Sequence, residues 1–381
     1  MGVGGWGRLA FAAAGAWFSI GADGAERWAL QYFYDKEDSS LALVDLQFPT
    51  ARRGVAVGVI TERRRRNPVA VLTGDGGRSW ETLPLQEAAI ALFFLNEQAG
   101  WMVSEKGRLW KTTEAGRNWT PVKLEGVRPQ PRRVFFADES RGWLLCAQRQ
   151  VYRTEDGGRK WQPVAVALDS GPPPEITVFD RAAFRGPVGL LTAWSRAPRD
   201  GSRLPDWMEP DLATRRQGPT TGVLLRTLDS GQTWSSHQLS RGGQIVRALI
   251  SPAGQALLLV QRPDSTEAAS MILSMDMQNL GMKPLYVEPT RWLTDLALLG
   301  DGRLLAAAID QQARGPAPPI PLRLKVLESR DGSLWTEMEV DYRAEARRAV
   351  LASAEGAAWI ATDTGMILRL EKSEVGSQKP E

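Results

Sequence analysis

The 381-residue sequence is poor in the residues that usually build metal and catalytic centres. It has one cysteine, Cys146, and one histidine, His237. No internal disulfide can form, a zinc site of cysteines and histidines is excluded, and a Ser-His-Asp triad would depend on that single histidine. We therefore predict no cofactor and no metal site. Cys146 ends an apolar run, and we interpret it as a small buried core residue.

Long apolar stretches are also lacking, because no run reaches the roughly 18 to 20 residues of a membrane span. Arg8 precedes a mostly apolar segment, residues 9–22, which is typical of a short export signal. We predict that residues 1–25 are a signal peptide, with a retained N-terminal anchor as the alternative. The protein would then be periplasmic or secreted. Residues 372–381 are expected to be a short flexible tail.

A strong excess of one charge is missing too. Lysine and arginine total 47 and aspartate and glutamate 44, which gives a net charge of +3. This small excess favours an anionic partner weakly and does not indicate nucleic acid. Hydrophobic residues make up 43% and charged residues 24%, which predicts a packed core. We expect a monomer.

What the sequence does contain is a repeated octet that runs from Thr or Ser to Trp. Its five copies are 73–80, 112–119, 154–161, 227–234 and the shorter 329–335, and we interpret Ser274-Met275-Asp276 as the beginning of a decayed sixth. Their acidic residues and tryptophans are Asp75 and Trp80, Glu114 and Trp119, Asp156 and Trp161, Asp229 and Trp234, and Asp331 and Trp335.

The octet has the chemistry of a turn between two strands. Its carboxylate can accept backbone N–H groups of the following residues, and glycine supplies a positive φ at little cost. The leading Thr or Ser ends one strand, and the Trp begins the next and packs inward. We therefore interpret these acidic residues as structural.

A second repeat precedes the first three octets. A strand ending in Phe is followed six residues later by Gly and a second apolar strand, as in Phe94 and Gly100. The same offset separates Phe48 from Gly54 and Phe136 from Gly142. Together with the strands beside the octet, each unit has four strands, called A to D here. Such a unit is a β-propeller blade.

Seven first strands can be counted, and they begin near residues 43, 89, 132, 176, 245, 293 and 347. The last unit lacks a fourth strand, whereas residues 26–31 look like a fourth strand without a blade. We predict an all-β fold: one seven-bladed β-propeller of four-stranded antiparallel blades over residues 26–371. The N-terminal strand would join the last blade and remove two exposed sheet edges.

Octets that alternate with F-x(5)-G-W strands resemble the Asp-box, or bacterial neuraminidase repeat (BNR), propellers. Within that group the sequence is similar to the photosystem II assembly and stability factors, most clearly in the first three blades. The resemblance implies a non-enzymatic exported protein that binds a protein partner through an arginine-rich surface.

The alternative is a sialidase-like glycoside hydrolase. Sialidases need an F/Y-R-I-P motif, which is absent, and a tyrosine nucleophile, whereas only five tyrosines are present. A hydrolase would use two carboxylates at a cleft, for which Asp45 and Asp295 are the candidates. A structural cell-surface module is a third interpretation.

Binding residues are expected on the face that carries the B–C loops, because inserted loops cluster there. When the blades are aligned on the aromatic residue of strand A, or its apolar equivalent, the position three residues earlier can be compared. In blades 1, 2, 3, 5 and 6 it is occupied by Asp45, Ala91, Arg133, Arg247 and Asp295. The charged four would line the channel mouth, either as a ligand site or as a set of salt-bridged channel residues.

The B–C loops carry two further candidates. The run Arg63, Arg64, Arg65 and Arg66 could dock an acidic protein or anionic lipid headgroups, or simply be solvated. Trp207, in a long loop of blade 4, could anchor a partner or pack beneath its own loop. We expect the partner to be another protein, acidic or membrane-associated, with a small molecule or sugar as the alternative.

Overall fold

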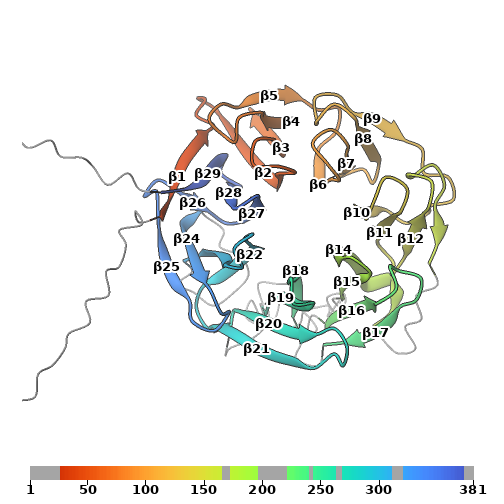
Figure 1. Cartoon of the computed structure of the whole chain (residues 1–381). Helices are drawn as coiled ribbons and strands as arrows, with labels where there is room; N and C mark the ends of the chain where they lie inside the picture. The colour runs from red at the N-terminus through yellow and green to blue at the C-terminus, as the bar shows by residue number, and fades with distance from the viewer. Residues whose placement is uncertain are drawn as a thin grey trace, which may run out of the picture.

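The computed structural model describes residues 26–164, 172–195, 221–239, 243–262, 268–310 and 321–372. Five four-stranded sheets and part of a nine-stranded sheet form six consecutive blades. Each of these blades is a four-stranded meander, and they are arranged around a central channel (Figure 1). Blade 1 contains β2 (Ser39–Gln47), β3 (Gly54–Glu62), β4 (Arg65–Thr73) and β5 (Glu81–Pro84). Blade 2 contains β6 (Ala89–Phe94), β7 (Gly100–Ser104), β8 (Leu109–Thr112) and β9 (Thr120–Val122). Blade 3 contains β10 (Pro131–Phe136), β11 (Gly142–Cys146), β12 (Val151–Thr154) and β13 (Gln162–Pro163).

Blades 4 to 6 continue around the ring. Blade 4 contains β14 (Thr177–Arg185), β15 (Val188–Ser195), β16 (Thr221–Thr227) and β17 (Ser235–Gln238), preceded by the short 3-10 helix η1 (Pro174–Ile176). Blade 5 contains β18 (Gln244–Ile250), β19 (Gln255–Gln261), β20 (Ser270–Asp276) and β21 (Met282–Glu288). Blade 6 contains β22 (Trp292–Leu298), β23 (Leu304–Ile309), β24 (Leu322–Ser329) and β25 (Thr336–Val340), and β26 (Glu345–Ala346) pairs with β24.

Blade 7 joins the two ends of the described chain. Its first three strands are β27 (Ala349–Ala354), β28 (Ala357–Thr362) and β29 (Met366–Lys372), and its fourth is β1 (Glu26–Phe33), which pairs antiparallel with β29. β1 also pairs in parallel with β25 of blade 6, so the two blades share one sheet (Figure 1). The predicted seven-bladed fold and its closure by an N-terminal strand are confirmed, and β29 extends one residue past the predicted boundary.

The octets form the turns between the third and fourth strands of their blades. In blade 1, the Thr73 hydroxyl accepts the N–H of Gly77 and donates to Asp75, whose Oδ1 accepts the N–H of Ser79. The Trp80 indole closes the turn by donating to the Gly77 carbonyl. The hydroxyl and the N–H of Ser79, together with the Thr73 hydroxyl, donate to Asp75 and lower its pKa, because they favour the charged carboxylate. All partners lie inside the octet, so its acid is a turn element.

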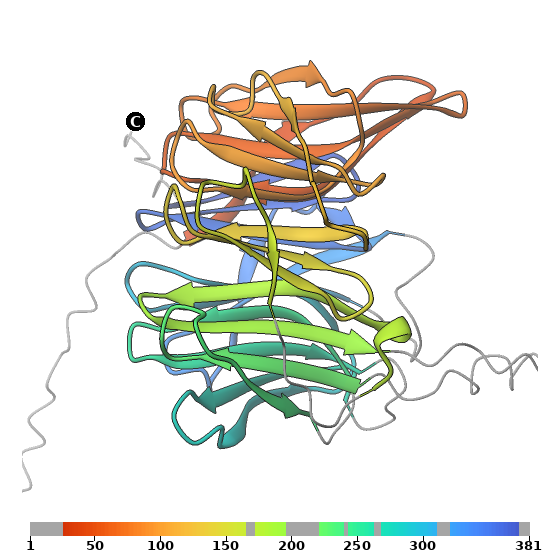
Figure 2. The ribbon, with the colours of Figure 1, turned by 90° about the vertical axis from the view of Figure 1, so that its right-hand side faces the viewer.

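The octets of blades 1 to 4 also bond to the turn between the first two strands of their own blade. Gly76 donates to the Arg52 carbonyl in blade 1, and Gly157 donates to the Ser140 carbonyl in blade 3. Both turns therefore lie on one side of the ring, which we call the octet side. The B–C and D–A connections leave the other strand ends, and we call that side the loop side. The β3–β4 hairpin projects there at the upper right of Figure 2.

The six-residue offset between Phe and Gly has a packing explanation. The Phe136 ring lies against Gly142 so closely that a Cβ on this glycine would be 2.6 Å from it. On its other face, the same ring stacks on Trp101 of the preceding blade, with centroids 3.9 Å apart. Phe48 and Trp359 stack in the same way between blades 1 and 7, at 3.6 Å. The repeat therefore encodes contacts between blades.

None of the helical segments in the described ranges has the length and hydropathy needed to span a bilayer.

Candidate functional site

A β-bulge in the innermost strand is the feature that places charged side chains at the channel. In blades 1 to 6 the pairing register of strand A shifts at the same point, and a bulge re-aims the side chain beside it. The residues that follow the shift are Asp45, Ala91, Arg133, Arg181, Arg247 and Asp295. Five of the six are the positions that the sequence alignment selected, and Arg181 of blade 4 is new.

Asp45 and Asp295 have the same structural role in two different blades. Asp45 accepts the N–H of Leu46 at 2.9 Å and, across the blade boundary, the N–H of Leu92 at 2.8 Å. Asp295 accepts the N–H of Leu296 and, from blade 7, that of Leu351 at the same two distances. Both are buried, with 3% and 5% exposure. Each carboxylate therefore fastens its blade to the next one.

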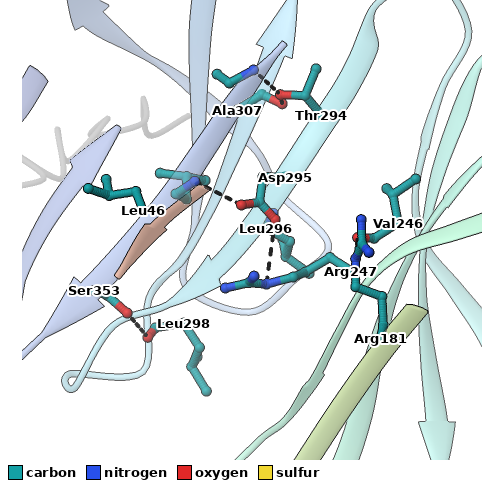
Figure 3. Close-up of polar contacts among 12 residues, drawn as sticks. Leu46, Arg181, Val246, Arg247, Thr294, Asp295, Leu296, Leu298, Ala307 and Ser353 are labelled. Carbon is teal, nitrogen blue, oxygen red and sulfur yellow. Dashed lines mark hydrogen bonds and ion pairs between the residues drawn. The ribbon is translucent and has the colours of Figure 1, made fainter. Parts of the chain in front are cut away.

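Each of these two carboxylates also pairs with an arginine of another blade. Arg247 of blade 5 lies 3.4 Å from Asp295 of blade 6, as Figure 3 shows. Arg133 of blade 3 hydrogen-bonds Asp45 of blade 1 at 3.1 Å and so reaches past blade 2. The corresponding residue of blade 2 is Ala91, whose methyl group leaves room for the guanidinium. The structure therefore brings Asp45 together with Arg133 and Arg247 together with Asp295.

Arg181 and Asp180 are channel residues that the sequence analysis missed. Arg133 donates to the Asp180 carbonyl, and Arg181 donates to the Val246 carbonyl of blade 5 (Figure 3). Burial lowers the pKa of Arg181 to about 10, and Asp180 opposes that shift, so the guanidinium is charged at neutral pH. The signal was present: Arg181 precedes Phe184 by three residues, the same spacing as in the other blades.

A cavity of about 460 Å³ opens on the loop side, beside these ion-paired channel residues. It is lined by the first residues of several inner strands and by the ends of B strands, including Trp194 and Gln261. Five arginines line it: Arg132, Arg133, Arg181, Arg347 and Arg348. Its carboxylates are Glu105 and Asp180, and both are already bound by arginines.

Two of the five arginines have unused hydrogen-bonding capacity. The side chains of Arg132 and Arg348 are exposed and form no hydrogen bond or ion pair with any residue in the described ranges. Arg347, by contrast, is held by Asp363 at 2.9 Å. The cavity therefore presents a cationic wall in which two guanidinium groups can bind an anionic group.

The arginine run of blade 1 adjoins this cavity. Arg66 forms a bidentate pair with Glu105, at 3.0 and 2.6 Å, and Glu105 lines the mouth. The structure differs from the predicted B–C loop, because β3 and β4 continue to a two-residue turn at Arg63 and Arg64. Arg63, Arg64 and Arg65 are exposed, and Arg63 has a weak ion pair with Asp38 at 3.9 Å.

Trp207 and most of the blade 4 and blade 6 B–C insertions lie outside the described residues. The two carboxylates proposed for a hydrolase, Asp45 and Asp295, do not line the mouth cavity and are occupied by backbone amides. Tyr286 donates to Glu288 on an outer strand, and burial together with this bond raises the pKa of the phenol. An activated tyrosine nucleophile would require the opposite shift.

The fold and the repeats define the class of protein: the chain is a seven-bladed β-propeller of the BNR type. Residues 24–167 match the family described as "Photosynthesis system II assembly factor YCF48". That segment contains β1 and blades 1 to 3, the blades in which the predicted resemblance is clearest. The chain therefore resembles the photosystem II assembly factors, as its repeats predict, and no curated protein matches it.

Solved structures show the same architecture. YCF48 bound to a D1 peptide is 18% identical, with 91% of this chain and 97% of that chain covered and a TM-score of 0.59. YCF48 from Cyanidioschyzon merolae is 15% identical, with 91% and 100% covered and a TM-score of 0.57. Virginiamycin B lyase from Staphylococcus aureus is 9% identical, with 91% and 99% covered and a TM-score of 0.57. At these identities the likeness concerns the fold alone.

Proposed function

We propose that the protein is an exported, non-enzymatic binding propeller that recognises an acidic segment of a partner protein at the arginine-lined mouth on the loop side. The observation that carries this proposal is the pair Arg132 and Arg348, which are exposed at a cavity yet have no anionic partner among the described residues. A peptide carboxylate is the group that guanidinium forks bind best. The YCF48 structure with a bound D1 peptide is consistent with a protein ligand for this fold.

The β3–β4 turn also favours binding at the loop side. Arg63 and Arg64 have φ of +45° and +74°, a backbone region that L residues rarely adopt, whereas Asn-Gly would form this turn cheaply. Each strained residue costs of order 1–3 kcal/mol, and such strain is concentrated at functional sites. Because Arg66 bonds Glu105 at the mouth, these arginines extend the cationic surface outward. A membrane-associated partner would suit this basic rim, and export would follow from the segment at residues 1–25.

The test is the affinity for a fluorescent acidic peptide, measured by polarisation, against a neutral peptide of the same length. We expect the variant Arg132→Gln with Arg348→Gln to bind the acidic peptide at least tenfold more weakly. Replacing Arg63, Arg64 and Arg65 by Ser should have a smaller effect that fades with added salt, because exposed charges are screened.

The matched control removes two exposed arginines from octets on the other side of the ring, Arg78→Gln with Arg330→Gln. If this control weakens binding as much as the mouth variant, the attraction comes from net charge and the mouth is not the site. If the mouth variant binds normally, the proposed face is wrong.

A further inference from the structure

The interface between blades 4 and 5 differs from the others in the described part of the ring because its core has no aromatic side chain. Its buried cluster consists of aliphatic residues and methionines, among them Leu190, Leu258 and Met275. Each of the other six core clusters, with the residues packed against it, contains at least one aromatic residue. Examples are Trp28, Trp359, Trp101, Trp110, Trp335 and Trp143.

Strand pairing identifies the residue that replaces the missing tryptophan. In the five octet blades, the residue after the octet Trp pairs with the residue before the octet's Thr or Ser. The pairs are Glu81 with Leu72, Thr120 with Lys111, Gln162 with Arg153, Ser235 with Arg226 and Thr336 with Glu328. In blade 5 the corresponding pair is Lys283 with Ser274, so Met282 stands where the Trp stands elsewhere.

The same register revises the decayed sixth octet. Met275, not Ser274, occupies the position of the leading Thr, so the hydroxyl that organises the other turns is absent. Asp276 still accepts the N–H of Gln278 at 2.7 Å and therefore holds a different turn.

A cavity of about 250 Å³ lies at this site, between the outer strand of blade 4 and the face of blade 5. Seven side chains form its apolar wall: Leu239, Val260, Met271, Leu273, Leu280, Met282 and Pro284. An apolar cavity of roughly 150 Å³ is enough to bind benzene. The space therefore accommodates a larger ring system, and methionine walls adapt readily to a planar guest.

The opening of this cavity is basic. His237, Arg262 and Lys283 line it, and no carboxylate does. The Arg262 guanidinium lies over the apolar wall, with Nη1 3.8 Å from the Met271 sulfur, and its side chain forms no other hydrogen bond or ion pair with a described residue. Lys283 is exposed beside Met282. The two cations lie toward different ends of the cavity, because Arg262 pairs with Ala269 and Lys283 with Ser274 along β20, so an acid attached to the ring would lie near one of them.

We propose that this inter-blade cavity binds an aromatic carboxylic acid of about the size of an indole derivative. The ring takes the place that an octet Trp fills in five other blades, and the carboxylate pairs with one of the two cations, Arg262 or Lys283. No residue that lines this cavity also lines the channel mouth, so the inference is independent of the proposed function.

The test uses the full chain and two probes, indole-3-propionate and neutral indole, measured by calorimetry and ligand-observed NMR. The wild-type protein should bind the acid at least tenfold more tightly than indole. Met282→Trp should abolish binding of both probes and preserve or raise the melting temperature, because Trp occupies this position in other blades. Leu280→Phe, which fills the cavity from another wall, tests the same point if Met282→Trp does not fold.

Charge removal separates the two parts of the site. Arg262→Gln with Lys283→Gln should weaken indole-3-propionate binding about tenfold and leave indole binding unchanged, whereas the exposed control Lys123→Gln should change neither. A wild-type protein that binds neither probe, or a folded Met282→Trp protein that still binds the acid, would overturn the proposal. Equal affinity for the acid and for indole would refute the role of the cations.

Discussion

The blades are joined to one another in two ways, by an aromatic layer further out and by a charged ring around the channel. In the aromatic layer, Phe136 stacks on Trp101 and Phe48 on Trp359, so equivalent interfaces use equivalent residues. In the charged ring, equivalent positions hold Asp, Ala or Arg, and their partners differ from blade to blade. The aromatic contacts therefore repeat between equivalent interfaces, whereas the charged contacts differ from one position to the next.

This difference separates the contacts that follow from the repeat from those that are particular to this protein. Stacking between rings follows from the repeat, because the Phe that packs on the glycine of its own blade also stacks on the Trp of the preceding blade. The ion pairs need the right residue in the right blade: Arg133 reaches Asp45 because Ala91 lies in the blade between them.

The largest effect is expected from the aromatic layer. Trp359 is fully buried, stacks on Phe48 and donates its indole N–H to the Gly76 carbonyl at 3.0 Å. Trp359→Ala should lower the free energy of unfolding by about 3–5 kcal/mol, as removal of a large core ring does. Denaturant unfolding measures this, with the exposed Leu334→Ala as a control near zero. A loss below 1 kcal/mol would show that the stack contributes little.

A smaller loss is expected from the charged ring. Asp45→Ala leaves the Leu92 N–H and Arg133 without their acceptor, so it should cost about 1–3 kcal/mol. Arg133→Met removes the ion pair but keeps both backbone bonds of Asp45, so it should cost less. If the two variants are equally unstable, the ion pair matters more than the backbone clamp.

The smallest effect should come from the exposed carboxylate of an octet turn. Hydrogen bonds from the side chain and backbone of Thr233 lower the pKa of Asp229 from 3.8 to about 2. A lowered folded-state pKa stabilises the protein above pH 3.8, and this contribution is lost as the pH falls through 2. The stability advantage of wild type over Asp229→Asn should therefore shrink between pH 4 and pH 2. Acid unfolding followed by circular dichroism tests this, and a constant gap would contradict it.

The sequence predicts the fold well because the recurring residues are those that contact the next blade. Phe-x(5)-Gly and the octet recur at fixed spacing, which is sufficient to place the strands and count the blades. The same alignment locates the inner positions at Asp45 and Asp295, but not their partners, because ion pairs across the channel join residues with no fixed separation.

Departures from the repeat explain what was missed. Phe184 and Gly189 are five residues apart instead of six, so Arg181 was not aligned with the other inner residues. In blade 5 the octet lost its hydroxyl and its Trp together, and the pairing of Lys283 with Ser274 was needed to find its register. The cationic mouth was predicted only in part: Arg133 was among the predicted residues, whereas the other four arginines were missed, because the mouth is assembled from segments far apart in the sequence.

The shared sheet of blade 7 has a consequence for how the chain reaches its final form. Gln31 hydrogen-bonds Glu371, so the fourth strand of this blade is made first during synthesis and its neighbour almost last. Contacts of such long sequence separation form slowly, because the entropy of closing the loop is lost before they stabilise anything. The growing polypeptide therefore stays an open arc with a free edge at each end until β29 has been made, and a chain that lacked β1 or β29 would never seal.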